Sequence, residues 1–364
     1  MPTSARPHNI IASAAPLVAT VVIALLMQFV VLQVVHPSHA RMLSLIGGSI
    51  ILAVSLTLVN GFTGQFSMGH AGFMAVGGYV AAAVTYYGSF RFWGSAAVHS
   101  GGLGDALFLL ASVLGGLAAA AIGYCVALPS LRLRGDYLAI VTLGFGEIVR
   151  VLLTQTGDVL SDVNEIRDTP WPRLLTKLGG ALGFTSAQGV PTYTSLFWVY
   201  FFVGITLLAA FRLKYSSYGR AFLAIREDEI AAEAMGVQTT KYKIRAFVIS
   251  SFFAGLAGSL YAHEIGSTLN PGELGFQKSF DVIIMVVLGG MGSISGAALA
   301  AIILTILPEA LRGFADYRMV LYALALILMM ILRPQGLFGI HEIWERGAWR
   351  GRGRKRRVAG EARA

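Results

Sequence analysis

Long runs of apolar residues constrain the fold of this chain more than any other feature of its sequence. Several runs reach the length of about 20 residues that a helix needs to cross about 30 Å of hydrocarbon. None shows the alternation of polar and apolar residues that marks membrane-spanning strands. Charged residues make up only 13% of the chain, about half the share found in soluble domains. The sequence therefore predicts an all-α polytopic membrane protein.

The predicted membrane spans follow one another along most of the chain. Eight are clear from the apolar runs, namely 10–35, 42–60, 68–87, 107–127, 137–154, 195–211, 246–263 and 319–332. A further apolar stretch, 280–311, is interrupted by GGMGSISG and is long enough for two short passes. We therefore expect about ten passes. The first run is too long for a signal-peptide core and no A-x-A-like cleavage site follows it, so we expect it to be retained.

Cationic residues predict the orientation of these spans. They gather in the segment 212–245 and in the tail 340–364, which ends in RGRGRKRRVAGEARA. Loops rich in Lys and Arg stay on the cytoplasmic side, so both segments and both termini should be cytoplasmic, and the stretch 155–193 should lie outside. Because the cations sit at the ends of apolar runs and in the tail, the net charge of +9 indicates contact with membrane lipid and no nucleic acid.

The count of passes suggests two membrane units of opposite orientation, the pattern of an inverted repeat in transport proteins. The similarity between the halves is confined to a Gly-rich break followed by small residues. On this basis we divide the chain into five parts: a first span and loop (1–41), a first membrane unit (42–211), a cytoplasmic loop (212–245), a second membrane unit (246–339) and a basic tail (340–364).

One glycine-rich stretch, VNGFTGQFSMGHAGFMAVGGY, interrupts the apolar sequence with polar residues. Glycine weakens a helix by about 1 kcal/mol relative to Ala, and irregular backbone inside a bilayer is tolerated only where protein or a wet cavity surrounds it. We therefore expect a translocation pathway for a polar solute at this break. The alternative is close helix packing through small residues. The candidate pathway residues are Asn60, Gln65, Ser67, Gly69, His70 and Gly72.

Ionisable residues within spans are functional candidates because they are costly in a membrane. Glu147 and Arg150 are three residues apart and can neutralise each other on one helix face. They are either a structural pair, which a neighbouring helix can also bind, or a direct contact for a solute or a proton. Asp281, shortly after Lys278, is either an interface anchor or a gate residue.

The cytoplasmic loop contains a predicted short amphipathic helix. Asp228 can cap it, Glu229 lies in its first turn and Gly236 can end it. Its apolar stripe needs another surface, and the acidic polar face disfavours lipid, because helices that lie on membranes favour Lys and Arg there. We therefore expect a protein partner. The stripe consists of Ile230, Ala231, Ala234 and Met235.

Four motifs together resemble permeases of ATP-driven importers of the branched-chain amino acid (LivM-type) family. They are GQFSMGHAGFMAVGGYVAA, LRLRGDYLAIVTLGFGEIVR, VVLGGMGSISGA and LILMMILRPQGLFG, in the same order as in that family. In addition, GRAFLAIREDEIAAEAMGV resembles the loop that such permeases present to their ATPases. The resemblance implies that the coupling residues are Gly219, Arg220, Ala224, Arg226, Glu227, Asp228, Glu229, Ala232, Glu233 and Gly236.

The resemblance implies a permease of the bacterial inner membrane that imports branched-chain or related small amino acids by alternating access. It also implies three kinds of protein partner: a homologous second permease, two cytoplasmic ATPases and a periplasmic solute-binding protein. The chain contains no Gly-Lys pair and hence no P-loop, so we expect it to be no enzyme and to bind no cofactor, with Mg-ATP held by the partners.

One departure from the family pattern leaves the solute open. Where the family carries a TGGPNGI-like sequence, this chain reads TGDVLSDVNEIRDTPWP, on the predicted outer side. Urea or short amides therefore remain alternative solutes within the family. An alternative from another class is an ion-coupled secondary transporter that uses Glu147 and Arg150.

Overall fold

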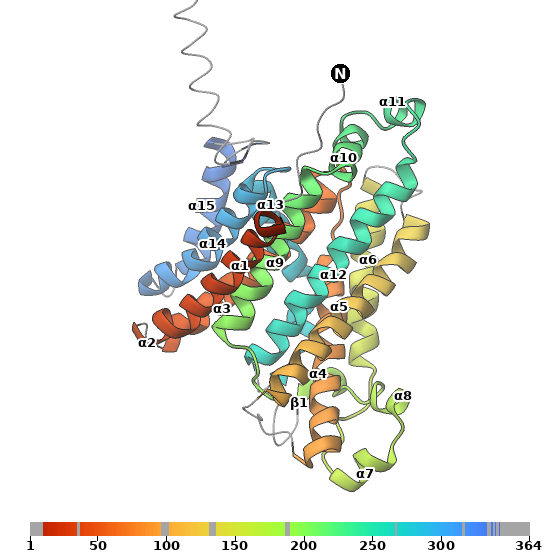
Figure 1. Cartoon of the computed structure of the whole chain (residues 1–364), viewed down its shortest axis with the longest axis vertical. Coiled ribbons are helices and arrows are strands. Elements are labelled where there is room, and N and C mark those ends of the chain that lie inside the picture. Colours follow the sequence, from red (N-terminus) through yellow and green to blue (C-terminus); the bar gives the residue numbers. More distant parts are fainter. Residues whose placement is uncertain are drawn as a thin grey trace, which may run out of the picture.

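The computed structural model describes residues 10–34, 37–95, 102–130, 136–185, 190–265, 268–314, 317–332, 336, 337, 339 and 342. Within these residues the chain is almost entirely helical (Figure 1). The described strands are β1 (Phe184–Thr185) and β2 (Thr268–Leu269), which pair antiparallel. The predicted all-α fold class is thus confirmed. The segment LRLRGD (131–136), which begins the second of the four motifs, and the basic tail lie almost wholly outside the described residues.

Long helices form the body of the molecule. They are α1 (Ile10–Leu26), α3 (Pro37–Leu56), α4 (His70–Trp93), α5 (Leu103–Ser130), α6 (Asp136–Thr154), α9 (Leu196–Lys214), α12 (Thr239–Ile265), α13 (Phe276–Gly289), α14 (Ile294–Ala310) and α15 (Arg318–Leu332). Five described helices are long and apolar enough to cross a membrane, and three shorter apolar helices accompany them. The chain is therefore a multi-pass membrane protein.

Short elements lie between or extend these helices. Two π-helical turns, η1 (Met27–Val31) and η2 (Thr57–Gly61), follow α1 and α3, and α2 (Leu32–Val34) follows η1. The others are α7 (Val163–Asp168), α8 (Trp171–Leu174), η3 (Gly180–Leu182), α10 (Ser217–Glu227), α11 (Glu229–Ala234), η4 (Pro271–Leu274) and η5 (Leu311–Phe314).

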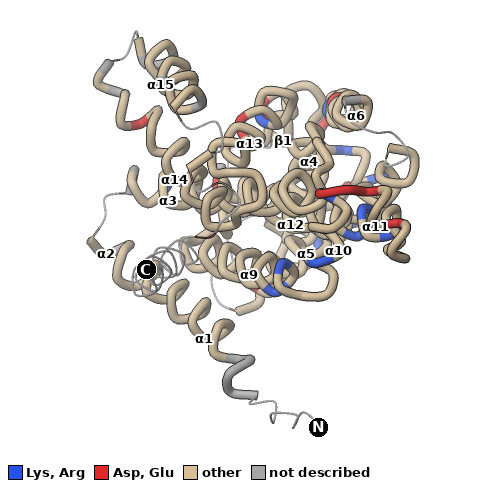
Figure 2. The backbone as a smooth tube through the Cα atoms, turned by 90° about the horizontal axis from the view of Figure 1, so that it is seen from above, with Lys and Arg blue, Asp and Glu red and all other residues tan. Residues whose placement is uncertain are grey.

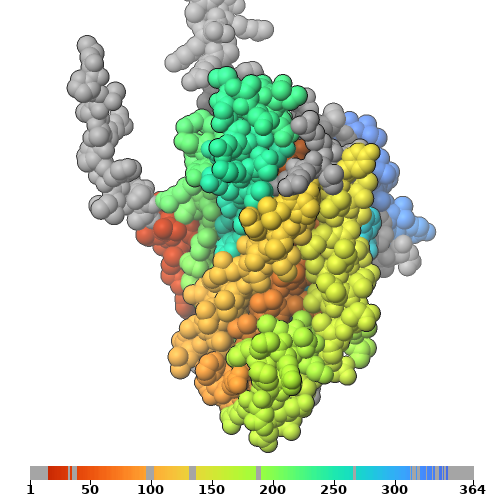
Figure 3. Space-filling view, turned by 90° about the vertical axis from the view of Figure 1, so that its right-hand side faces the viewer, coloured from red at the N-terminus to blue at the C-terminus, as the bar shows by residue number. Residues whose placement is uncertain are grey.

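The short elements mark two opposite ends of the bundle. Helices α10 and α11 lie at one end, and α7, α8 and β1 lie at the other (Figure 1). In the space-filling view, the segment around α10 and α11 projects at the top and the segment after α6 covers the bottom (Figure 3). Seen from above, α13 lies between α6 and α15, and charged residues gather around α10 and α11 (Figure 2).

Small residues let the central helices α4, α5 and α12 approach closely. A Cβ atom added to Gly258 of α12 would lie 1.9 Å from the Met74 carbonyl oxygen of α4, and one added to Gly115 of α5 would lie 2.5 Å from the Gly77 carbonyl oxygen. Close approach through small residues is how helices associate where lipid removes the hydrophobic driving force. Gly residues at these positions therefore fix the core on which the other helices pack.

The observed helix bounds differ from the predicted spans at several places, and α12, for example, begins at Thr239 and not at residue 246. The third span begins at His70 and continues to Trp93, because residues 64–69 form a non-helical segment before it. The predicted span 42–60 ends in the π-helical turn η2. The apolar stretch 280–311 begins four residues earlier, and its predicted break is confirmed, since α13 ends at Gly289 and α14 begins at Ile294.

Candidate functional site

The break between α3 and α4 is closed by its own polar side chains. The Asn60 Oδ1 atom accepts the Ser67 backbone N–H at 3.1 Å, and the Asn60 side-chain nitrogen donates to the Ser67 carbonyl at 3.4 Å. The His70 ring pairs with the Ser55 hydroxyl at 2.8 Å. All these groups are buried, as is Gln65, whose Oε1 atom has no hydrogen-bond partner among the described residues. The break is thus a packed, internally bonded structure.

The glycines of this break pack against α6. A Cβ atom on Gly69 would lie 2.2 Å from the Thr142 carbonyl oxygen, and one on Gly72 would lie 2.9 Å from the Gly146 Cα atom. The Thr142 hydroxyl also accepts the Met68 N–H at 3.0 Å. In this arrangement of the helices, Gly69 and Gly72 therefore allow close helix packing, which was the alternative interpretation of these glycines. A role in solute passage stays a prediction.

Glu147 and Arg150 form an ion pair on α6 that also holds the start of α13. The Arg150 Nε and Glu147 Oε2 atoms are 2.7 Å apart, and Glu147 Oε1 accepts the Phe276 N–H at 3.0 Å. The first N–H groups of a helix lack partners within the helix, and an acidic side chain there stabilises it. The geometry is that of a pair bonded to a neighbouring helix, although about a third of each side chain (35% and 34%) remains exposed.

The short helix α11 has the cap that the sequence predicts. Asp228 Oδ1 accepts the N–H groups of Ile230 and Ala231 at 2.9 and 3.0 Å, and Gly236 follows the helix with a positive φ of 85°. Lys243 Nζ contacts Glu229 Oε1 at 2.6 Å and fixes α11 to the start of α12. The cap, the ion pair and the turn give this short helix a defined position.

The apolar stripe of α11 is exposed. Ile230 is 70% and Met235 is 85% exposed, whereas Ala232 on the other side of the helix is buried against the protein. The polar residues Glu227, Asp228 and Glu233 are exposed beside the stripe, as are Arg220 and Ala224 on α10. Exposed large apolar side chains rimmed by charges are typical of a protein interaction surface. We refer to α10 and α11 together as the coupling element.

The coupling element is bonded directly to two breaks in the helix bundle. Arg226, at the end of α10, donates from Nη1 to the Gly61 carbonyl at 2.8 Å and to the Met291 carbonyl at 3.2 Å. Gly61 ends the π-helical turn after α3, and Met291 lies between α13 and α14. These two breaks also touch each other, because a Cβ atom on Gly61 would lie 2.7 Å from the Gly292 nitrogen. Arg226 thereby connects α10 to both breaks.

Gly219 allows α10 to follow α9 in a tight turn. A Cβ atom at Gly219 would lie 2.1 Å from the Lys214 carbonyl oxygen. The Ser216 hydroxyl caps α10 by accepting the Gly219 N–H at 3.2 Å. The turn therefore brings the end of α9 and the start of α10 into a fixed relation.

The buried carboxylate of Glu342 connects the end of α9 to the start of α14. It accepts the N–H groups of Ile294 and Ser295 at 3.1 and 3.0 Å and contacts Lys214 Nζ, which also donates to the Gly292 carbonyl at 3.1 Å. Burial raises the pKa of Glu342, but hydrogen bonds from Lys214 and Ser295 outweigh it and hold the pKa below its usual value. Sequence reasoning missed this residue, because a single Glu after the last span carries no distinctive signal.

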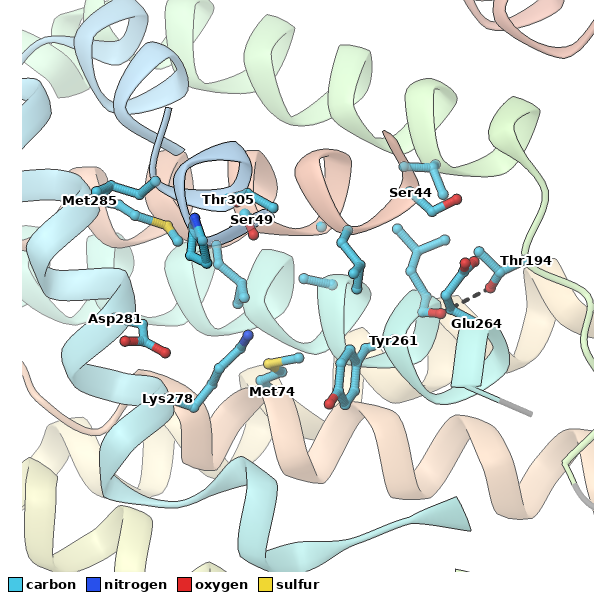
Figure 4. Close-up of a pocket in the computed structure, with 18 of the residues that line it drawn as sticks. Ser44, Ser49, Met74, Thr194, Tyr261, Glu264, Lys278, Asp281, Met285 and Thr305 are labelled. Carbon is cyan, nitrogen blue, oxygen red and sulfur yellow. Dashed lines mark hydrogen bonds between the residues drawn. The ribbon is translucent and has the colours of Figure 1, made fainter. Parts of the chain in front are cut away.

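A cavity of about 320 Å³ lies between α3, α12, α13, α14 and α15 (Figure 4). None of the six predicted pathway residues lines it. Its charged residues are Glu264 on α12 and Lys278 and Asp281 on α13, and the remaining lining side chains are mostly apolar. The lining residues used below are Leu52, Met74, Val199, Leu260, Tyr261, Glu264, Lys278, Asp281, Met285, Leu304 and Thr305. Sequence reasoning found Asp281 and missed the cavity, because residues of several helices far apart in sequence line it.

Comparisons with known proteins find one family and several relatives. The family model described as branched-chain amino acid transport system, permease component, matches residues 38–332. The permease protein LivM of the high-affinity branched-chain amino acid transport system of Salmonella typhimurium is 39% identical over 301 residues, which cover 79% of this chain and 67% of the relative. LivM of Escherichia coli K12 is 38% identical over the same shares.

A more distant relative is a second permease protein of the same kind of system. LivH of Salmonella typhimurium is 27% identical over 304 residues, which cover 80% of this chain and 92% of the relative. No solved structure matches the chain significantly.

Proposed function

The chain belongs to the family of permease components of branched-chain amino acid transport systems, and from this premise we propose that it is the membrane permease subunit of an ATP-driven importer. Its solutes are branched-chain or related small amino acids. Solute crosses by alternating access of the helix bundle, and the energy comes from ATP hydrolysed by partner subunits. The relatives named LivM and LivH are two permease proteins of such systems.

The observation that carries this proposal is the coupling element with its exposed apolar stripe. The stripe lies on a short, firmly capped helix, so it presents a rigid surface, and burying Ile230 and Met235 against a partner contributes about 1.5–3 kcal/mol for each fully covered side chain. Acidic residues beside it add charge that selects a basic partner surface. A cytoplasmic ATPase that moves on binding and hydrolysing ATP would act through this contact.

Arg226 supplies the connection between the coupling element and the bundle. It is the residue of α10 that is bonded to the break after α3 and to the break between α13 and α14. Hydrogen bonds from a guanidinium group are charge-assisted and stronger than neutral ones. We infer that displacement of α10 shifts both breaks together and so biases the bundle between two arrangements.

Ten passes with both termini in the cytoplasm are consistent with the course of the helices. Successive helices run back and forth between the end of the bundle that carries α10 and α11 and the opposite end near α7, α8 and β1 (Figure 1). The bonds of Lys214 and Glu342 keep the end of α9 and the segment after α15 at the same end. The cation-rich loop lies there too, and the positive-inside rule assigns that end to the cytoplasm.

An inverted repeat is supported by two helix breaks that occupy equivalent positions in the two membrane units. The sequence alone did not indicate this correspondence. The two glycine-rich breaks lie at the same end of the bundle, whereas an inverted repeat relates opposite ends. The counterpart of the break after α3 is instead the segment between α12 and α13, which lies on the side of β1. Each of these breaks follows a long helix and contains an Asn that accepts a nearby backbone N–H, Asn60 and Asn270.

The importer would contain at least four kinds of subunit. A homologous second permease completes the membrane core, two ATPases dock on the coupling elements, and a periplasmic binding protein delivers solute to the segment after α6. Urea and short amides remain alternative solutes. The ion-coupled alternative needs Glu147 or Arg150 to be free for ions, whereas each is engaged with the other and Glu147 also with α13.

Co-purification tests this function. The tagged chain, expressed with the other subunits and purified in mild detergent, should co-elute with the ATPases. Replacing Ile230 with Asp should abolish co-elution, because it places a charge in the centre of the stripe. The matched control is Leu182→Asp, a 78% exposed residue at the opposite end of the bundle, which should leave co-elution unchanged. Loss of ATPases with the control alone, or with neither variant, would contradict the proposal.

A further inference from the structure

The cavity between α3, α12, α13, α14 and α15 contains two charged side chains that form no salt bridge or hydrogen bond with a described residue. Neither Lys278 nor Asp281 forms a salt bridge with a described residue. Lys278 instead lies with its Nζ atom 5.7 Å from the Tyr261 ring centroid. The third charge, Glu264, has Ser44 and Arg41 close enough to stabilise it. Lys278 and Asp281 lie three residues apart on α13 and act on each other without a direct contact. The hydrogen-bonding groups of both side chains therefore remain available to a ligand.

These two charged side chains are half-buried on a helix that packs against α4. Ser279, between them in sequence, accepts the N–H of Ala71 in the first turn of α4 at 3.1 Å. Helix α4 begins beside Ser55 of α3, since His70 pairs with that residue. Lys278 and Asp281 are thus at the level of the broken helix. Charged side chains without a hydrogen-bonded partner among membrane-spanning helices are costly and indicate a functional site.

The rest of the cavity has the shape and chemistry of a small-molecule site. Its volume of about 320 Å³ lies at the lower end of the range of about 300–1,000 Å³ usual for ligand pockets. Apolar side chains form much of the wall, among them Leu52, Met285 and Leu304. Met285 lies one turn after Asp281 on α13 (Figure 4). The buried Thr305 hydroxyl has no hydrogen-bond partner among the described residues.

We propose that this cavity binds a zwitterionic amino acid with an apolar side chain, whose α-ammonium group pairs with Asp281 and whose α-carboxylate pairs with Lys278. Such a ligand supplies a hydrogen-bonded, oppositely charged partner to both side chains at once. The apolar wall receives the side chain, and the Thr305 hydroxyl is available to the ligand's polar end. The proposal rests on the proposed import function and assigns it a binding site.

The cavity also explains how this site couples to transport. Met74 of α4 and Met285 of α13 both line it, so the helices that meet the two breaks form its wall. In this proposal, a shift of the two breaks by Arg226 changes the distance between Lys278 and the residues of α12 that line the cavity. The affinity for the solute is then lower in one arrangement of the bundle, and the solute leaves from that arrangement.

Equilibrium binding of radiolabelled L-leucine to the purified complex, measured by scintillation proximity, tests the assignment. Competitors separate the two charges: 3-methylbutylamine lacks the carboxylate and 4-methylpentanoate lacks the ammonium group. The Asp281→Asn variant should bind leucine about tenfold more weakly, as expected for a lost charge-assisted bond away from water, and should lose competition by the amine only. Lys278→Gln should lose competition by the acid only.

The matched control is Glu309→Gln, the same loss of a carboxylate on α14, one turn beyond Thr305 and outside the cavity lining. It should bind leucine as the wild type does. The double variant Lys278→Asp with Asp281→Lys restores both charges in exchanged positions and should regain binding, which excludes misfolding as the cause of the single losses. The assignment would be overturned if the double variant does not regain leucine binding and each single variant loses competition by the amine and the acid equally.

Failure of this inference can be told from failure of the proposed function. If the wild-type complex in proteoliposomes takes up leucine with ATP and the Asp281→Asn and Lys278→Gln variants match Glu309→Gln, the function stands and this site is wrong. If phosphatidylethanolamine co-purifies with the wild type and is lost from Asp281→Asn while leucine binding is unchanged, the cavity holds lipid and the inference is wrong. Absence of ATP-dependent uptake by the wild type contradicts the function itself.

Discussion

Replacement of Arg226 by Ala tests the proposed connection between the coupling element and the bundle. The side chain makes two hydrogen bonds to backbone carbonyls, at Gly61 and Met291. Hydrogen bonds from charged groups contribute about 1.5–3 kcal/mol each. Because Arg226 is partly exposed, we take the lower value, so the two bonds together contribute about 3 kcal/mol, or more than a hundredfold in the equilibrium that keeps α10 attached to the breaks.

The expected result is uncoupling. In proteoliposomes that contain the complete complex, Arg226→Ala should hydrolyse ATP at a rate within about twofold of the wild type, while leucine transported per ATP falls by about tenfold or more. Arg226→Lys keeps the charge but not the planar fork of donors and should be intermediate. The control Lys241→Ala removes an exposed cation at the start of α12 and should leave the ratio unchanged. An unaltered ratio in Arg226→Ala would refute the connection.

Three further predictions follow from other contacts. Gly69→Ala should destabilise the purified protein by about 1–3 kcal/mol through overpacking, because its Cβ atom would lie 2.2 Å from a carbonyl oxygen, whereas Gly144→Ala, which meets nothing within 4 Å, should not; equal melting curves would contradict the packing. The lowered pKa of Glu342 means that its stabilising effect is present above the usual glutamate pKa of about 4.3 and is lost as the pH falls below it. The melting temperature of the wild type should therefore fall more on acidification than that of Glu342→Gln. Melting temperatures that fall in parallel with pH in the two proteins would contradict this role of Glu342. A Cys at Ala224, in a background with Cys125 replaced, should react with an impermeant thiol reagent from the cytoplasmic side only, and labelling from outside would invert the orientation.

Much of the helical fold follows from the apolar runs, because each run long enough to cross a bilayer can satisfy its backbone only as a helix. The positions of the helix breaks were also predictable where glycine clusters, as at 289–296. The start of α4 was not, since the hydrogen bonds of Asn60 with Ser67 stabilise a non-helical segment that the apolar pattern does not distinguish from helix. The cap of α11 was predictable because Asp228 and Gly236 act locally.

The parts of the site that depend on distant segments could not be predicted. The glycines at 61 and 292 are far apart in sequence, and only the fold brings them into contact. For the same reason the pairing of Glu147 with the start of α13 and the place of Glu342 beneath α14 have no local signal. Asp281 was identified from its cost in a membrane, whereas its relation to the apolar wall of the cavity required the packing of several helices.

The central claim is that this chain moves solute only with energy from partner ATPases that act through α10 and α11. The most direct measurement is accumulation of L-leucine against a gradient in proteoliposomes, compared between the complete complex and the chain purified alone. The account predicts accumulation by the complex that needs ATP, and none by the chain alone under any ion gradient. Accumulation by the chain alone, driven by a proton or sodium gradient, would contradict it.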